Sequence, residues 1–232
     1  MATVVLVHGT TAGGWVWKKI AAELEAFGHV VYRPTLTGLG ERSHLLNRDV
    51  GLDTHIHDVV NVLEFEDLED VVLVGHSYGG AVIEGVADRV PERIAKMIYL
   101  DAVVLEDGEA LIDVLPPALR EQTERQVQAE GQGWLIPLSR GPNDVITKNT
   151  PHPYRAWAQP IHLSNPKARD IPRVYVRFTA DKQPGAHFSE AMEKSLARVK
   201  AAGWPLYEVD TVHQITPDPQ PKADILLKIL SE

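Results

Sequence analysis

The sequence contains no cysteine among its 232 residues, and this absence excludes several kinds of chemistry. Disulfide bonds, thiolate metal sites and cysteine nucleophiles all need a thiol, so none of them is available to this chain. If the protein is an enzyme with a covalent intermediate, its nucleophile must therefore be an oxygen or a lysine.

Basic residues and long apolar runs are also scarce. Lys and Arg number 23 against 32 Asp and Glu, for a formal net charge of −9, and the basic residues are scattered. Because nucleic-acid surfaces cluster their cations, we expect no nucleic-acid partner. No apolar run approaches the roughly 20 residues that cross a bilayer. Residues 1–7 enter an apolar run without a basic segment or cleavage site, so we expect a cytoplasmic protein without membrane contact.

Short, almost unbroken apolar runs rich in β-branched residues recur along the chain. They predict strands at residues 3–7, 30–33, 71–74, 96–100, 173–178 and 206–209. Such runs are typical of parallel strands that are buried on both faces. With 44% hydrophobic residues, the chain is large enough for one core. We expect an α/β fold: a doubly wound, mostly parallel sheet with helices on both faces.

Helical periodicity appears between the runs. One predicted helix face comprises Trp17, Ile20, Ala21, Leu24 and Phe27, and another comprises Phe188, Met192, Leu196 and Val199. A third helix is expected from Tyr78, and a last one over residues 220–230. The alternation of strands and helices supports the doubly wound arrangement.

Residues 106–165 break this rhythm. The segment is rich in proline and contains no convincing strand, but Trp134, Leu135, Ile136, Trp157 and Ile161 give it apolar material to pack. A structureless stretch of this length is improbable in a compact domain. We predict a mainly helical cap over residues 106–165, with the core formed by residues 1–105 and 166–232.

The third predicted strand ends in "GHSYGG", where Gly75, Ser77 and Gly79 satisfy the G-x-S-x-G pattern between a strand and a helix. In this context the pattern is a nucleophile elbow, in which a serine occupies a strained turn and glycines let strand and helix approach. Ser77 Oγ is then presented at the carboxyl end of the sheet, where open α/β folds bind ligands. Ser77 is the predicted nucleophile.

A serine nucleophile needs a base and a carboxylate that orients the base. His213 follows the last predicted strand and is the expected base. Asp181 follows the fifth strand and is the expected carboxylate. Asp101, which ends the fourth strand, competes for that role, and Asp210 is a more distant alternative. The chain order Ser, Asp, His is that of α/β-hydrolases.

An acyl-transfer site also needs donors for the oxyanion. The glycine-rich stretch after the first strand brings the N–H of Thr10 to this edge, where we expect it to pair with the N–H of Tyr78. Gly9 lets the loop turn beneath the substrate, and His8 is expected to be structural. No phosphate-binding glycine pattern can be written through this stretch, which argues against nucleotide binding.

Other residues are weaker candidates. Trp134, Tyr154 and Trp157 form a candidate substrate pocket, and the cap histidines His152 and His162 line it or lie elsewhere. His55 and His57 have no third ligand at a suitable spacing, so we expect no metal.

The stretches "VHGTTAGGW", "GHSYGG", "YLDAVVLEDG", "YVRFTADK" and "DTVHQ" together resemble the α/β-hydrolase superfamily. Within it, the chain is most similar to small plant methyl esterases and hydroxynitrile lyases with their bacterial esterase relatives. The resemblance covers most of the chain and is weakest in the cap. It implies a six-stranded core and no cofactor, supports Ser77, Asp181 and His213 as the triad, and favours Asp181 over Asp101.

Two departures bear on the reaction. The lyases carry a threonine after the histidine of the first strand and a lysine after the catalytic histidine, where this chain has Gly9 and Gln214. We therefore expect a carboxylesterase acting on small or medium apolar esters, with a hydroxynitrile-lyase-like enzyme as the alternative. A receptor that binds its ligand with little turnover is a second alternative, because the fold alone does not determine function.

Overall fold

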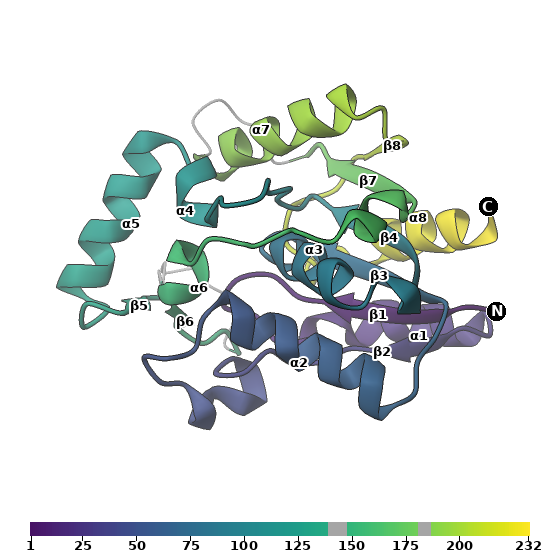
Figure 1. Cartoon of the computed structure of the whole chain (residues 1–232), viewed down its shortest axis with the longest axis horizontal. Helices are drawn as coiled ribbons and strands as arrows, with labels where there is room; N and C mark the ends of the chain where they lie inside the picture. Colours follow the sequence, from purple (N-terminus) through teal and green to yellow (C-terminus); the bar gives the residue numbers. More distant parts are fainter. Residues whose placement is uncertain (139–147, 181–186) are drawn as a thin grey trace.

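A computed structural model describes residues 1–138, 148–180 and 187–232, with side chains left out for residues 187–191. Six parallel strands form the main sheet in the order β2-β1-β3-β4-β7-β8 (Figure 1). The strands are β1 (Thr3–Val7), β2 (Val30–Tyr32), β3 (Val71–His76), β4 (Ile94–Leu100), β7 (Arg173–Phe178) and β8 (Leu206–Val209). The predicted α/β fold class is confirmed.

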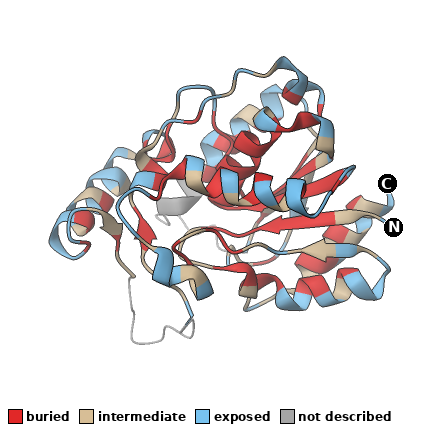
Figure 2. Cartoon of the chain, turned by 60° about the horizontal axis from the view of Figure 1, so that its bottom comes forward, coloured by how far each residue is buried: buried red, intermediate tan, exposed pale blue. Residues whose placement is uncertain are grey.

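Helices cover both faces of this sheet. They are α1 (Lys18–Ala26), α2 (Leu52–Phe65), α3 (Gly79–Arg89), α7 (His187–Ala201) and α8 (Gln220–Ser231). Successive residues of a strand point to opposite faces. In β1, Val5 and Val7 join the apolar cluster under α2, α3 and α7, whereas Val4 and Leu6 join the cluster under α1 and α8. Because both faces are buried, the strand has no polar alternation (Figure 2).

The helices expected from periodicity are present, with one correction. Phe27 lies just beyond the end of α1 and is 68% exposed, although its spacing placed it on the buried face. The chain turns there through Gly28, whose φ is 85°, so Phe27 leaves the helical register. Short 3-10 helices lie in the connecting segments: η1 (Gly14–Trp17), η2 (Gly40–Leu45), η3 (Pro91–Arg93) and η4 (Pro166–Asp170).

In its described residues, the segment between β4 and β7 carries the α-helices α4 (Leu111–Val114), α5 (Pro117–Ala129) and α6 (Arg155–Ala158). It also contains a short antiparallel ladder of β5 (Leu135–Ile136) and β6 (His152–Pro153). The expectation of no strand here was wrong. Two-residue strands are too short for an alternating pattern, and Pro153 argues against a strand in any sequence reading. Residues 139–147 of the predicted cap lie outside the described residues.

The cap segment lies at the end of the sheet opposite to the two chain termini (Figure 1). Asp101 leaves β4 at this end, and residues 102–110 lead from there into α4. The carboxyl ends of the strands therefore face the cap. Any site formed by the loops after β1, β3, β4 and β8 is positioned between core and cap.

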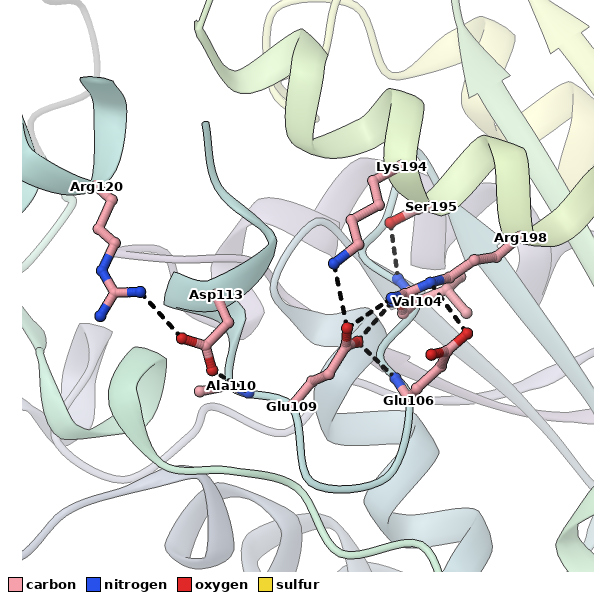
Figure 3. Close-up of polar contacts among 9 residues, drawn as sticks. All are labelled: Val104, Glu106, Glu109, Ala110, Asp113, Arg120, Lys194, Ser195 and Arg198. Carbon is pink, nitrogen blue, oxygen red and sulfur yellow. Dashed lines mark hydrogen bonds and ion pairs between the residues drawn. The ribbon is translucent and has the colours of Figure 1, made fainter. Parts of the chain in front are cut away.

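Hydrogen bonds and ion pairs connect Glu106 and Glu109, at the start of the cap segment, to α7 (Figure 3). Arg198 Nη1 and Nη2 donate to the two carboxylate oxygens of Glu109 at 2.7 and 2.6 Å, and Lys194 Nζ adds a 3.1 Å contact. The N–H of Glu106 also donates to Glu109 at 2.9 Å. Burial raises the pKa of Glu109, but these donors outweigh it and hold the pKa at about 2. The charged carboxylate is thus the favoured form.

Replacing Glu109 by Gln tests how much the ion pairs of Glu109 with Arg198 and Lys194 contribute to stability. The folded pKa lies below the ordinary value of 4.5, so the carboxylate stabilises the fold fully above pH 4.5 and less as the pH falls toward 2. After allowance for solvent screening, we expect Glu109→Gln to lower the free energy of unfolding by about 1–2 kcal/mol at pH 7. Chemical denaturation at pH 7 and pH 3.5 measures the difference, which should shrink at the lower pH.

Glu106→Gln is the matched control. The Glu106 side chain is 70% exposed and contacts Arg198 at 3.4 Å, so its loss should cost less than about 0.5 kcal/mol. Equal effects of the two substitutions would contradict the role assigned to Glu109.

Candidate active site

Ser77 lies in a strained turn between β3 and α3. Its φ is 55°, in the left-handed region that non-glycine residues rarely adopt, and its side chain is almost fully buried. Hydrogen bonds hold the turn on both sides, since Ser77 N donates to Leu100 O and Val103 N donates to Ser77 O. A strained residue fixed by its surroundings is common at functional sites. The turn has the form of the predicted nucleophile elbow.

The glycines around Ser77 are required by close backbone approach. A Cβ at Gly75 would lie 2.6 Å from the carbonyl oxygen of Gly79. A Cβ at Gly79 would lie 2.6 Å from the carbonyl oxygen of Val7 in the neighbouring strand. Neither distance is possible for a real side chain, so strand and helix can meet here only at glycine.

The loop after β1 lies directly against the elbow. A Cβ at Gly9 would approach Ser77 Cβ to 2.9 Å and His76 Nδ1 to 3.1 Å. The next residue, Thr10, is therefore held beside the serine. Within the described part of the chain, the N–H groups of Thr10 and Tyr78 have no hydrogen-bond acceptor. Two such donors beside a serine are the arrangement that an oxyanion needs.

His213 follows β8 and contacts a carboxylate at the same edge of the sheet. Its Nδ1 lies 2.7 Å from Asp101 Oδ2, and the Asp101 side chain is only 6% exposed. Asp101 is itself fixed, because its N–H donates to Val176 O at 2.7 Å and its Oδ1 accepts from Phe178 N at 3.3 Å. This contact engages Nδ1 of His213 with a carboxylate, which fixes the orientation of the imidazole ring.

The expected carboxylate, Asp181, lies outside the described residues. In the described part of the chain, the competing candidate Asp101 is the residue whose carboxylate contacts His213. Asp210 is exposed. The sequence analysis favoured Asp181 over Asp101, although both residues follow strands that end at this edge.

His76 was not identified as a site residue from sequence, although it precedes Ser77. Its Nε2–H donates to the backbone oxygen of His213 at 2.8 Å, and the two rings lie 4.7 Å apart. Burial lowers the pKa of His76 well below its ordinary value, and the nearby charges of His213 and Lys222 lower it further. A neutral His76 thus holds the His213 loop beside the elbow.

A cluster of buried histidines surrounds Tyr78. The Tyr78 hydroxyl donates to His55 Nδ1 at 2.8 Å, while His55 Nε2–H donates to Thr37 O at 3.0 Å. His8 Nδ1–H donates to Gly9 O, and His8 Nε2 accepts from Leu36 N. Burial lowers the pKa values of His8 and His55 to about 4. These histidines are neutral and contact the backbone of the loops around the elbow.

The three aromatic residues predicted to line a pocket, Trp134, Tyr154 and Trp157, contact different parts of the structure. Trp157 is buried and its Nε1–H donates to Thr10 Oγ1 at 3.1 Å, so it reaches the site. Tyr154 donates its hydroxyl to Glu124 on α5, and its N–H donates to Trp134 O. The Trp134 ring lies under the Arg48 guanidinium. Of these three aromatic residues, Trp157 is the one with a described hydrogen bond to Thr10, a predicted oxyanion-hole residue.

The histidine pair that raised the question of a metal site, His55 and His57, belongs to α2. No group of three or more His, Asp or Glu side chains in the described residues has the arrangement of a metal site. No described helix is both long and apolar enough to cross a membrane.

The sequence matches the model of the alpha/beta hydrolase family over residues 4–219. The chain belongs to that family. The resemblance inferred from "GHSYGG" and the flanking motifs is thereby confirmed, as is the expected fold.

Relatives of this alpha/beta hydrolase include a carbendazim hydrolyzing esterase of a Nocardioides species, 52% identical over 126 residues. That alignment covers 54% of this chain and 52% of the relative, so the chain spans about half the length of the curated relative that it matches. An extracellular alpha/beta-hydrolase from a Paenibacillus species is 27% identical, with 98% of each chain covered and a TM-score of 0.79. An Arabidopsis methylesterase is 25% identical, with 100% and 99% covered and a TM-score of 0.71.

The buried histidines make the stability of this alpha/beta hydrolase sensitive to acid. Their folded pKa values lie below the ordinary 6.5, so the unfolded chain binds more protons, and stability falls as the pH drops from 6.5 toward 4. Between pH 7 and pH 5, His55 alone should contribute a decline of about 2 kcal/mol. We expect His55→Gln to reduce the decline by that amount in urea denaturation.

His57→Gln provides the control, because His57 is exposed on the same helix. This variant should keep the pH dependence of the original protein. A His55→Gln decline as steep as that of the original would contradict the assignment.

Proposed function

We propose that this protein is a serine hydrolase that cleaves small or medium apolar carboxylic esters. The observation that carries the proposal is the His213–Asp101 contact at 2.7 Å, beside a serine held in a left-handed turn. Two unpartnered N–H groups among the described residues, those of Thr10 and Tyr78, support an acyl-transfer reaction in particular. Relatives named as esterases and methylesterases support the same class.

In the proposed mechanism, Ser77 Oγ attacks the ester carbonyl carbon while His213 Nε2 accepts the hydroxyl proton. The carbonyl oxygen becomes an oxyanion that accepts hydrogen bonds from the N–H groups of Thr10 and Tyr78. Asp101 holds the imidazole in the required tautomer and stabilises the imidazolium. His213 then protonates the departing alcohol, which leaves an acyl group on Ser77.

Water completes the cycle. His213 removes a proton from a water molecule that attacks the acyl carbon, and the same two N–H groups bind the second oxyanion. Collapse of this intermediate releases the acid and returns the proton to Ser77 Oγ. The proposed cycle needs no cofactor or metal.

Two alternative functions, a hydroxynitrile-lyase-like reaction and a receptor-like role, are distinguished by the experiments below. A hydroxynitrile-lyase-like reaction lacks its two auxiliary groups here, because Gly9 and Gln214 occupy those positions. A receptor-like role would give one acylation without turnover. The cytoplasmic location stays a prediction, since one of the relatives described above is an extracellular protein.

Ser77→Ala tests the nucleophile. We expect sustained release of p-nitrophenol from p-nitrophenyl acetate and butyrate by the original protein, and a loss of at least about 10⁴-fold in the variant. Stopped-flow absorbance measures both the first turnover and the steady state. Carbendazim is assayed in parallel, because a relative that hydrolyses it shares 52% identity over 126 residues. Full activity of Ser77→Ala would contradict the proposal. A single burst of p-nitrophenol from the original protein, without steady-state turnover, would favour the receptor alternative.

Asp101→Asn tests which carboxylate orients His213. Asn cannot accept from the imidazole in the same way or stabilise the imidazolium, so we expect kcat to fall by about 10²- to 10⁴-fold. Asp181→Asn is the paired variant and should lose much less. The reverse order of effects would return the carboxylate role to Asp181.

A further inference from the structure

The loop that carries Thr10 is bound to the cap by several hydrogen bonds. Trp157 Nε1–H donates to Thr10 Oγ1 at 3.1 Å, and Thr150 N–H donates to Thr11 O at 2.9 Å. Thr11 N–H in turn faces His152 Nδ1 at 3.4 Å, a long hydrogen bond. These partners come from β6, from α6 and from the residues just before β6, and they contact the loop that follows β1.

Thr11 needs such support because of its backbone conformation. Its φ is 63°, in the left-handed region, where a β-branched residue is strained. Both polar groups of its backbone are bonded to the cap, the N–H to His152 and the oxygen to Thr150. The conformation of the residue next to Thr10 is therefore determined by the cap.

His152 also contacts the second proposed oxyanion donor. Its ring meets the Tyr78 ring edge-on, with centroids 4.9 Å apart and an interplanar angle of 78°. His152 is fully buried, and its Nε2 has no hydrogen-bond partner among the described residues. Burial, together with the nearby His55 and His8, lowers the pKa of His152 well below its ordinary value. A neutral ring can accept from Thr11 at Nδ1, as the geometry requires.

We propose that His152 and Trp157 are positioning residues through which the docked cap aligns the two oxyanion donors, Thr10 N–H and Tyr78 N–H. The inference rests on the proposed ester hydrolysis and deepens it. Neither side chain need touch the reacting atoms. An oxyanion donor displaced by a fraction of an ångström stabilises the transition state less, while ground-state binding changes little.

The first test is a double-mutant cycle on the Thr10–Trp157 contact. Thr10→Val removes the acceptor Oγ1 but keeps the shape and the backbone N–H, and Trp157→Phe removes the donor but keeps an aromatic ring. We expect each variant to lower kcat by about 10-fold or more with KM changed less than about threefold. The double variant should be no worse than the more affected single variant, because both remove the same bond.

The second test concerns His152. His152→Phe removes the Nδ1 acceptor but keeps a ring against Tyr78, whereas His152→Gln supplies an amide oxygen as a new acceptor. We expect kcat to fall by about 10-fold or more in the Phe variant and to be largely restored in the Gln variant.

A tetrahedral-adduct inhibitor reports on the oxyanion site directly. A trifluoromethyl ketone forms an anionic adduct with the serine, so its inhibition constant should rise by the same factor as kcat falls in each variant. Trp204→Phe is the matched control, since Trp204 contacts Tyr99 and Arg173 in the described structure and not the loop after β1. The free energy of unfolding is measured for every variant to separate loss of fold from loss of alignment.

Unchanged kcat and inhibition constants in Thr10→Val, Trp157→Phe and His152→Phe would overturn this inference while leaving ester hydrolysis intact. The same holds if stability falls but the kinetic constants of the folded fraction do not change. An original protein that forms neither product nor adduct would instead overturn the proposed function, and this inference with it.

Discussion

The close approach of three backbone segments at Ser77 is the constraint on which the site depends. The elbow, the strand that precedes it and the loop after β1 pack without room for a Cβ at Gly9, Gly75 or Gly79. This packing buries Ser77 and holds it in a left-handed turn. It also brings Thr10 beside the serine. The geometry is thus determined by backbone atoms, whose positions vary little once the sheet has formed.

Neutral histidines surround this backbone. His8, His55, His76 and His152 are all buried, and each has a lowered pKa. A neutral imidazole offers one donor and one acceptor, so it can join two loops without a charge in the core. His8 and His55 use both nitrogens in this way. In the same part of the structure, His213 contacts the Asp101 carboxylate, and the proposed mechanism gives this residue the role of base.

The cap is joined to the core by two different kinds of contact. At the periphery, Glu109 forms ion pairs with Arg198 and Lys194 of α7. Near the elbow, neutral hydrogen bonds connect Thr10 and Thr11 to the cap. The charged contacts lie at the partly exposed surface, whereas the neutral contacts lie next to the proposed oxyanion donors. Under the proposed function, the cap therefore contributes to the site as well as covering it.

The sequence by itself determined the sheet and the turn at Ser77, and it predicted the base, because these depend on patterns that span few residues. Apolar runs predicted the strands, and the glycines of "GHSYGG" identified Ser77. Only the tertiary structure decided what faces these residues. Asp101 lies 112 positions from His213, and His152 lies 141 positions from Thr11. Several strands end at one edge of a parallel sheet, and local patterns cannot tell which of their side chains will meet, since that depends on how the whole chain packs.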